Sequence, residues 1–394
     1  SSGDINPYRF AVRALEHAEW EDIVGVFFYQ WYGGPPGWGY WGGLGDRDPP
    51  CNWAAHYLPD IFPGYDPARE LYYYLGRSGQ VDLEPDHLLR WQLEMMTRAG
   101  IELIIATWWG IDGGLPDETR DGGNTDRVFN KIINEWMSQP CMPRVRWSVY
   151  VEPFMEMVDD RPRLRDSNSI YRALRHIVLN YGNSPYFARL YGAPLIFVYS
   201  VKEDEISAFY EAVHQLWQEG IIVYLNVDSP HVQPGPDDAR GIIFNPPLHT
   251  FPEAIFAFQA CHIYDPVYYT IQATGGGSLT HSRSVSPGFW YYRDTSARLL
   301  RDPVKYQEAW DRFADITSRH SSTSDQYVQF LLITTWNEYN EGTQIEPAHR
   351  VILNDADCFS DAGSYGTTYV DITANAVAQF KRGPDCEAHN GDVD

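Results

Sequence analysis

The chain has 394 residues, a length that an α/β barrel with long loops reaches as a single unit. Its formal net charge of −23 argues against nucleic acid and an anionic membrane as partners, because both would repel it and no Lys/Arg block offsets the charge. The five cysteines are scattered without a Cys-x-x-Cys pair, which excludes a cysteine-based zinc site and a dense disulfide framework. A neutral substrate fits this composition best.

Short apolar runs alternate along the chain with amphipathic segments, which is the pattern of βα units around a parallel sheet. Eight strands are predicted, at residues 23–29, 101–108, 146–151, 194–199, 221–226, 241–245, 284–289 and 328–336. The seventh is the weakest of them, because Pro287 removes a backbone donor from the ladder. Eight strands in one chain favour a closed barrel over an open doubly wound sheet.

Segments with apolar residues at i, i+3 and i+4 predict helices between these strands. They lie at residues 85–98, 128–137, 170–179, 205–218, 304–316 and 372–381. The expected fold is therefore a single-domain (β/α)8 TIM barrel over residues 1–382, in the α/β class. Segments 33–80, 111–126 and 272–284 interrupt the repeat and are expected to be insertions on the catalytic rim, while the polar residues 383–394 are expected to form a disordered tail.

Aromatic, amide and carboxylate residues follow the predicted strands, where barrel enzymes place their active sites. The aromatic fraction of 15% is high, and aromatic faces stack on sugar rings, although a single aromatic residue more often serves core packing. The candidate site residues are Tyr29, Trp31, Trp108, Trp109, Glu152, Tyr199, Asn245, Asn337, Glu338, Tyr339 and Glu341. This set is typical of a sugar-binding site, whereas glycine motifs that bind phosphate are absent.

Cleavage of a glycosidic bond requires a proton donor at the leaving oxygen and a second carboxylate that acts as base or nucleophile. Glu152, Glu338 and Glu341 are the candidates, because each closely follows an apolar run, where a carboxylate needs a partner or a purpose. A single glutamate at a strand end is as often an ion-pair or capping residue as it is a catalytic one. No metal and no cofactor are predicted, since the chain lacks His-Glu-x-x-His, and the acidic run at 117–126 is interpreted as a solvated loop.

Residues 336–347, Trp-Asn-Glu-Tyr-Asn-Glu-Gly-Thr-Gln-Ile-Glu-Pro, resemble the W-N-E-W-x-E-G-T-Q-I-E-P signature of glycoside hydrolase family 99, the endo-α-mannosidases and endo-α-mannanases. Weaker similarity is present at residues 28–33, 107–109, 151–154, 194–199, 285–289 and 365–373. The resemblance implies a (β/α)8 barrel and retaining, endo-type hydrolysis without a metal.

The resemblance also implies roles for individual residues. Glu338 would deprotonate the sugar's own 2-hydroxyl, giving a 1,2-anhydro sugar, and Glu341 would act as acid and base at the leaving oxygen. Glu152 would be a substrate-binding carboxylate, Trp108 a stacking platform and Tyr199 a subsite hydroxyl.

Three segments depart from the family pattern in regions that build sugar subsites, and one of them is the segment after Asn245. Leu-Tyr-Tyr-Tyr-Leu-Gly at 71–76 replaces the mannosidases' I-G-S-S-F-Y-P-x-L-G, and Tyr-Ser-Val-Lys at 199–202 stands where the family continues with Asp-Ser-Tyr. The substrate is therefore an α-mannan-like polymer or another glycan.

Two alternatives stay open. The first is a retaining barrel glycosidase with Glu152 as acid and Glu338 as nucleophile; the second is a non-catalytic carbohydrate-binding or polysaccharide-assembly protein. A glycan is the expected partner, with neither nucleic acid nor membrane, and a monomer is favoured over an oligomer. An extracellular or periplasmic location is favoured, with a cytoplasmic one left open.

Overall fold

A computed structural model gives the structure of the chain. It describes residues 23–30, 57–59, 85–111, 125–152, 157–158, 161–162, 166–190, 192–199, 201, 205–227, 242–244, 258–259, 280–289, 297, 299–320, 330–338, 341–350 and 365–381.

The centre of the described structure is a 10-stranded sheet in the order β10-β9-β8-β4-β3-β1-β13-β12-β11, with β7 paired to β8. Its strands are β1 (Ile23–Phe28), β3 (Leu103–Trp108), β4 (Arg146–Val151), β7 (Arg189–Leu190), β8 (Ala193–Val198), β9 (Tyr224–Val227), β10 (Ile242–Phe244), β11 (Phe258–Gln259), β12 (Thr280–Val285) and β13 (Phe330–Ile333). Along this path every pair is parallel except β9 with β10. The last long strand, β13, pairs with the first, β1, as in a (β/α)8 barrel.

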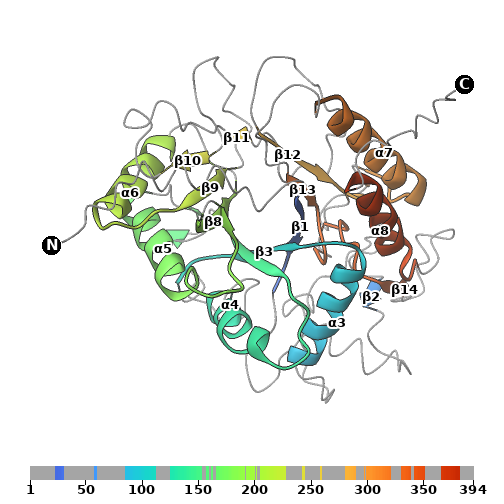
Figure 1. Cartoon of the computed structure of the whole chain (residues 1–394), viewed down its shortest axis with the longest axis horizontal. Coiled ribbons are helices and arrows are strands. Elements are labelled where there is room, and N and C mark those ends of the chain that lie inside the picture. Colours follow the sequence, from blue (N-terminus) through green and yellow to red (C-terminus); the bar gives the residue numbers. More distant parts are fainter. Residues whose placement is uncertain are drawn as a thin grey trace, which may run out of the picture.

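Four strands of this sheet, β1, β3, β8 and β13, are buried along their whole length. Their sequences, IVGVFF, LIIATW, APLIFV and FLLI, are nearly continuous apolar runs, as expected for parallel strands that are covered on both faces. Figure 1 shows the helices arranged around the outside of these strands. The fold is therefore of the α/β class, with helices packed outside a parallel sheet.

The helices are α3 (Pro85–Arg98), α4 (Thr125–Asn134), η4 (Trp136–Ser138), α5 (Ser167–Asn180), α6 (Ile206–Gln218), α7 (Pro303–His320) and α8 (Thr368–Phe380). Each of the six α-helices overlaps a predicted helical segment, because the apolar side chains recur on one face. In α4, for example, Val128, Phe129, Ile132 and Ile133 are all buried. Helix α8 contacts both α7 and α3, so the last helix lies beside the first helix described (Figure 1).

All eight predicted strands overlap strands of the structure, but two predictions were wrong in detail. The seventh strand runs over Thr280–Val285 and ends before Pro287, which cannot donate to a ladder, so most of the predicted 284–289 segment lies beyond it. The sixth strand, β10, is antiparallel to β9. The segment that joins them contains Pro230, Pro234 and Pro236, and its sequence has no helical pattern that would provide a parallel crossover.

The predicted insertions differ from the structure at their ends. Thr125 and Asp126 begin helix α4, so they do not belong to the loop predicted at 111–126, and residues 280–284 lie in β12 instead of the third insertion. Within residues 33–80 the structure describes β2 (Tyr57–Pro59), which pairs with β14 (Ala348–Arg350). The predicted tail 383–394 lies outside the described residues. A second small pair joins β5 (Met157–Val158) and β6 (Arg161–Pro162). Pairing between β10 and β11, which would close the ring, is not observed among the described residues.

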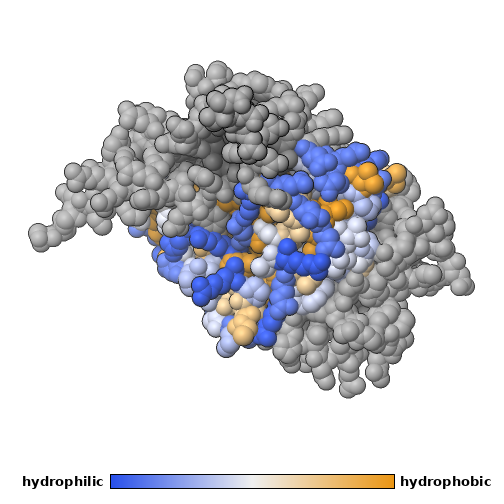
Figure 2. All heavy atoms as spheres, turned by 45° about the vertical axis from the view of Figure 1, so that its right-hand side comes forward, coloured by the Kyte–Doolittle hydropathy of each residue, from blue (hydrophilic) through white to orange (hydrophobic). Residues whose placement is uncertain are grey.

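The outer surface is mainly hydrophilic on the described part of the face in Figure 2, with apolar residues in small patches. Leu300 and Val304, at the start of α7, are among the exposed large apolar side chains. No helix among the described residues is long and apolar enough to cross a membrane.

Candidate active site

The candidate residues that the structure describes lie at the carboxyl edge of five neighbouring strands. Because β13, β1, β3, β4 and β8 run parallel, the residues that follow them meet at one edge of the sheet. The backbone N–H of Glu152 donates to the carbonyl of Trp108 at 2.9 Å, and that of Tyr199 donates to the carbonyl of Val151 at 2.9 Å. The pairing therefore continues past the strand ends and brings Glu152 beside the end of β3.

Asn337 ties the loop after β13 to the end of β1. Its Oδ1 accepts the backbone N–H of Tyr29 at 2.7 Å, and its Nδ2 donates to the carbonyl of the same residue at 2.9 Å. Both ends of the fully buried amide are thus bonded to backbone, so Asn337 fixes the position of its neighbour Glu338 relative to β1. Its contact with a glycan remains a prediction, as does that of Tyr29, whose side chain is largely buried.

Glu338 lies in a tight loop that a pair of threonines closes. Its side chain is only 3% exposed, its backbone N–H donates to Thr335 Oγ1 at 2.8 Å, and its carbonyl accepts the N–H of Thr343 at 3.3 Å. The two threonine hydroxyls lie 3.0 Å apart. Glu341 belongs to the same loop and is partly exposed, so the loop presents one buried and one accessible carboxylate.

Arg301 holds the far side of this loop in place. Its guanidinium donates to the carbonyl of Gly342 at 3.0 Å and to the carbonyl of Gln344, on either side of Thr343. The same guanidinium carbon lies 4.3 Å from the ring centroids of both Tyr365 and Tyr369, which is cation–π contact on two rings. Arg301 thereby connects the start of α8 to the residue that follows Glu341.

Gly288 permits the close approach of the chain that carries Arg301. A Cβ at Gly288 would lie 2.8 Å from the Cα of Arg301, a distance at which one backbone would have to move. Pro287 and Gly288 therefore act as a pair at the end of β12, where the proline ends the strand and the glycine makes room for Arg301.

Glu346, the third acidic residue of the segment 336–347, has a structural position. Its carboxylate is fully buried and accepts the side-chain N–H groups of Gln92 at 2.7 Å and Trp336 at 3.2 Å. Its backbone carbonyl accepts the hydroxyl of Tyr365 at 2.9 Å. These contacts fasten the end of the segment to α3 and to the start of α8.

Glu152 is 6% exposed and is linked to Trp109 through one hydroxyl. Thr107 Oγ1 donates to Glu152 Oε1 at 3.1 Å and accepts the indole N–H of Trp109 at 3.0 Å. A hydrogen bond donated to a carboxylate favours its charged form, so this contact suits an ionised Glu152. The sequence singled out Glu152 and Trp109 but missed Thr107, whose position inside an apolar strand gives no signal of its own.

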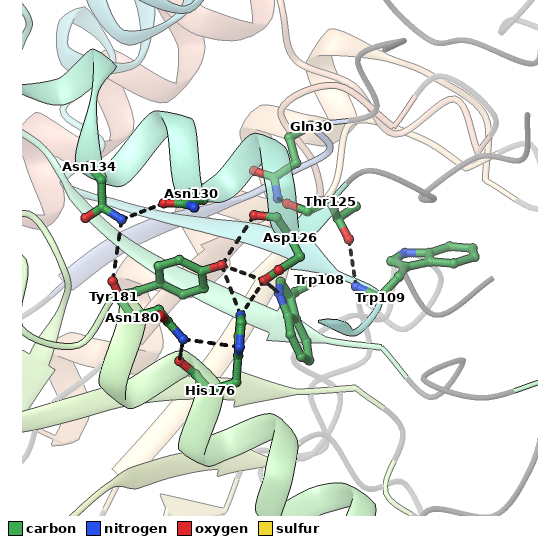
Figure 3. A network of polar contacts seen from close by, with 10 residues as sticks. All are labelled: Gln30, Trp108, Trp109, Thr125, Asp126, Asn130, Asn134, His176, Asn180 and Tyr181. Carbon is green, nitrogen blue, oxygen red and sulfur yellow. Dashed lines mark hydrogen bonds and ion pairs between the residues drawn. The ribbon is translucent and has the colours of Figure 1, made fainter. Parts of the chain in front are cut away.

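Trp108 and Trp109 point in different directions, as Figure 3 shows. The side chain of Trp108 is 0% exposed, and its indole N–H donates to Asp126 Oδ1 at 2.9 Å, whereas Trp109 is partly exposed. In this conformation the indole of Trp108 offers no face to a sugar. Of these two adjacent tryptophans, Trp109 is the one with an accessible side chain here.

Asp126 collects three donors at the start of α4 (Figure 3). Besides Trp108, its Oδ1 interacts with His176 Nε2 at 3.0 Å and accepts the hydroxyl of Tyr181 at 2.5 Å. Burial by itself would raise the pKa of Asp126, but the hydrogen bonds from His176, Tyr181 and Trp108 outweigh it, so the pKa lies below its ordinary value. Burial and the neighbouring carboxylate raise the pKa of Tyr181 well above its ordinary range. The cluster therefore holds an ionised Asp126, and the solvated loop predicted here is wrong for this residue.

The remaining candidates divide between described and undescribed residues. Tyr199 is partly exposed, and its ring packs edge-on against Tyr150 with centroids 5.4 Å apart. Trp31, Asn245 and Tyr339 lie outside the described residues. Among the residues that the structure describes, no three His, Cys, Asp or Glu side chains are grouped as metal ligands.

The chain has distant relatives among known proteins. No family model matches the chain. It is 23% identical to the glycoprotein endo-α-1,2-mannosidase of Mus musculus over 351 residues, covering 82% of this chain and 67% of that protein. It is 22% identical to the glycoprotein endo-α-1,2-mannosidase-like protein of Mus musculus over 354 residues, covering 82% and 69%.

Solved structures show the same fold. A GH99 endo-α-mannosidase of Bacteroides thetaiotaomicron superposes with a TM-score of 0.53 and 20% identity, over 92% of this chain and 98% of the other. A glycoside hydrolase-like protein superposes with a TM-score of 0.51 and 12% identity, over 91% and 95%.

Proposed function

We infer that this chain, a divergent relative of the family 99 glycoside hydrolases, is a retaining, endo-acting glycoside hydrolase that cleaves a neutral glycan at Glu338 and Glu341. The observation that carries the proposal is the loop after β13. It holds a buried Glu338 through Thr335 and Thr343, carries a partly exposed Glu341, and is fixed by Arg301. One buried and one accessible carboxylate in the same loop are the two groups that cleavage of a glycosidic bond requires.

The proposed reaction has two steps in which the two glutamates exchange protons with the substrate. In the first, Glu338 takes the proton of the sugar's 2-hydroxyl, the freed oxygen attacks the anomeric carbon, and the glycosidic bond breaks as Glu341 protonates the leaving oxygen. In the second, Glu341 takes a proton from water, which attacks the anomeric carbon of the 1,2-anhydro sugar. The bond between the anomeric carbon and the 2-oxygen breaks as Glu338 returns its proton to that oxygen. Two inversions give net retention, and both glutamates end in their starting states.

The substrate we propose is an uncharged polysaccharide or oligosaccharide. The net charge of −23 disfavours polyanionic chains, and the carboxylates of Glu152, Glu338 and Glu341 can accept hydrogen bonds from sugar hydroxyls. The relatives named above are endo-α-mannosidases, so an α-mannan is the first polymer to test. The departures at 71–76 and 199–202 make a different glycan the second.

The two proposed roles predict different responses to the leaving group. Glu341→Gln should stop turnover of a natural glycan but still release the aryl group from an aryl glycoside of the same sugar in the first step, because that leaving group needs no proton. The second step, in which Glu341 is the base, should be slowed. Glu338→Gln should lose activity on both substrates, because no attacking oxygen forms. Glu219→Gln, a surface glutamate that pairs with Arg175, is the matched control and should behave as wild type.

The same pair of substrates tests the alternative in which Glu152 is the acid and Glu338 the nucleophile. In that case Glu152→Gln, and not Glu341→Gln, would keep activity only on the aryl glycoside. The hydrogen bond from Thr107 leaves one oxygen of Glu152 engaged within the protein. If wild type cleaved neither substrate but bound a glycan, the result would support the non-catalytic interpretation.

A further inference from the structure

The hydroxyl of Thr107 joins an aromatic side chain to a carboxylate at the edge of the sheet. Oxygen Oγ1 accepts the indole N–H of Trp109 at 3.0 Å and donates its one proton to Glu152 Oε1 at 3.1 Å. A hydroxyl that uses its donor and an acceptor position in this way sets the separation of the two groups it joins. Thr107 itself is buried, so it cannot reach a substrate directly.

The backbone around Trp109 is fixed independently of this contact. Its N–H donates to Thr125 Oγ1 at 2.9 Å, and Gln30 Nε2 donates to the carbonyls of Thr107 and Thr125 at 3.0 and 2.8 Å. Figure 3 shows Gln30 and Thr125 on one side of this turn and the indole of Trp109 extending away from it. The backbone is therefore anchored, and the hydrogen bond to Thr107 determines the orientation of the indole.

The adjacent tryptophan cannot provide the same surface. Trp108 is fully buried and its N–H is held by Asp126, which also contacts His176 and Tyr181. Trp109 is the partly exposed member of the pair. A pyranose ring placed on its face would bury C–H groups against the ring and could donate a hydroxyl to Glu152.

We propose that Thr107 is the positioning residue of the sugar subsite expected at Trp109 and Glu152. The ligand class is a neutral pyranose with one apolar C–H face and at least one free hydroxyl that donates to Glu152. The assignment of this subsite to substrate binding rests on the proposed function, whereas the Thr107 link itself does not.

Thr107→Val keeps the shape of the side chain and removes the hydroxyl, and Thr107→Ser keeps the hydroxyl. On whichever of α-mannan, α-glucan or β-glucan the wild type cleaves, Thr107→Val should raise KM about tenfold with kcat changed less than about twofold. Thr107→Ser should restore a KM close to that of wild type. Thr373→Val is the matched control, because Thr373 is also buried and hydrogen-bonded, to Tyr306 at 2.9 Å, but lies in α8.

A spectroscopic signal separates failure of this subsite from failure of the proposed function. In the full chain labelled with ¹⁵N-tryptophan, the indole resonance of Trp109, assigned with Trp109→Phe, should move and exchange faster with water in Thr107→Val but not in Thr107→Ser. An unchanged resonance in Thr107→Val would overturn the link. An unchanged KM in Thr107→Val would overturn the subsite while the glycosidase assignment stands. A wild type that cleaves none of the glycans, combined with a shifted resonance, would support the link and contradict the proposed function.

Discussion

Asp126 is the residue at which burial and hydrogen bonding oppose each other most directly. Burial disfavours its charge, but donors from α5, from Tyr181 and from the end of β3 favour it, and the pKa is lowered as a result. A carboxyl whose folded-state pKa is depressed stabilises the fold above its unfolded-state pKa, about 3.8 here. That contribution is lost as the pH falls through the lower, folded-state pKa.

Asp126→Asn tests this contribution. We expect the free energy of unfolding to fall by about 1–3 kcal/mol at pH 5, because a charged acceptor of buried donors is lost. The difference between wild type and Asp126→Asn should shrink as the pH is lowered from about 4 to 2, since wild type then protonates Asp126. Denaturant unfolding at a series of pH values measures both quantities, and a difference that stays constant to pH 2 would contradict the assigned charge state.

Site residues could be predicted from the sequence where they lie close together along the chain. Glu338 and Glu341 could be proposed because both stand in one continuous segment after a strand. Asp126, His176 and Tyr181 could not, because 50 and 55 residues separate Asp126 from the other two and no motif joins them. The burial of Trp108 was equally invisible, since Trp108 and Trp109 are identical side chains at adjacent positions.

At the scale of elements, the loop after β13 depends on a clamp supplied from outside it. Arg301 donates to the carbonyls of Gly342 and Gln344 and lies against the rings of both Tyr365 and Tyr369. A planar guanidinium can make both hydrogen bonds and both ring contacts together, whereas the single ammonium of lysine cannot. We therefore expect Arg301 to determine the position of Glu341.

Arg301→Lys should lower kcat about tenfold with a smaller change in KM, because misplacing Glu341 costs proton transfer more than binding. Steady-state kinetics on the natural glycan measures the split. Arg98→Lys is the matched control, since Arg98 makes an exposed 2.6 Å ion pair with Asp371 on the same helix α8. Equal losses in the two variants would show that the clamp has no specific part in the site.

The elements themselves were predictable where their side-chain pattern is strong. Helix α3 has the predicted bounds, and β4 does as well, because a clear apolar face or run defines each of them. The strand β12, with the sequence THSRSV, was displaced in the prediction because its polar residues carry no apolar signal. The predicted segment 284–289 contains Pro287, which cannot donate to the ladder. The direction of β10 depends on its connection to β9, which a strand pattern does not encode.

At the scale of the whole molecule, the alternation of apolar strands and amphipathic helices was enough to predict the α/β class and the neighbour relations of most strands. The pairing of β13 with β1 follows from the barrel topology and not from any local sequence feature. The charge also acts at this scale, because −23 on the chain creates a negative potential around the whole surface.

We expect this potential to disfavour anionic glycans. Carboxylated derivatives of a cleaved polysaccharide should show a lower kcat/KM than the neutral polymer at low ionic strength. The difference in kcat/KM between the two polymers should decrease as the salt concentration rises from about 0.01 to 0.5 M, because the screening length falls from about 30 Å to a few ångströms. Rates on matched neutral and carboxylated polymers across this range are the measurement, and a preference for the anionic polymer would contradict the expected neutral substrate.

The most direct test of the glycosidase assignment is product analysis by NMR on a panel of α-mannans, α-glucans and β-glucans, with wild type and Glu338→Gln in parallel. We expect wild type to release new reducing ends from at least one polymer, first formed with the anomeric configuration of the cleaved bond, and Glu338→Gln to release none. Products first formed with the opposite configuration, or equal release by Glu338→Gln, would contradict this expectation.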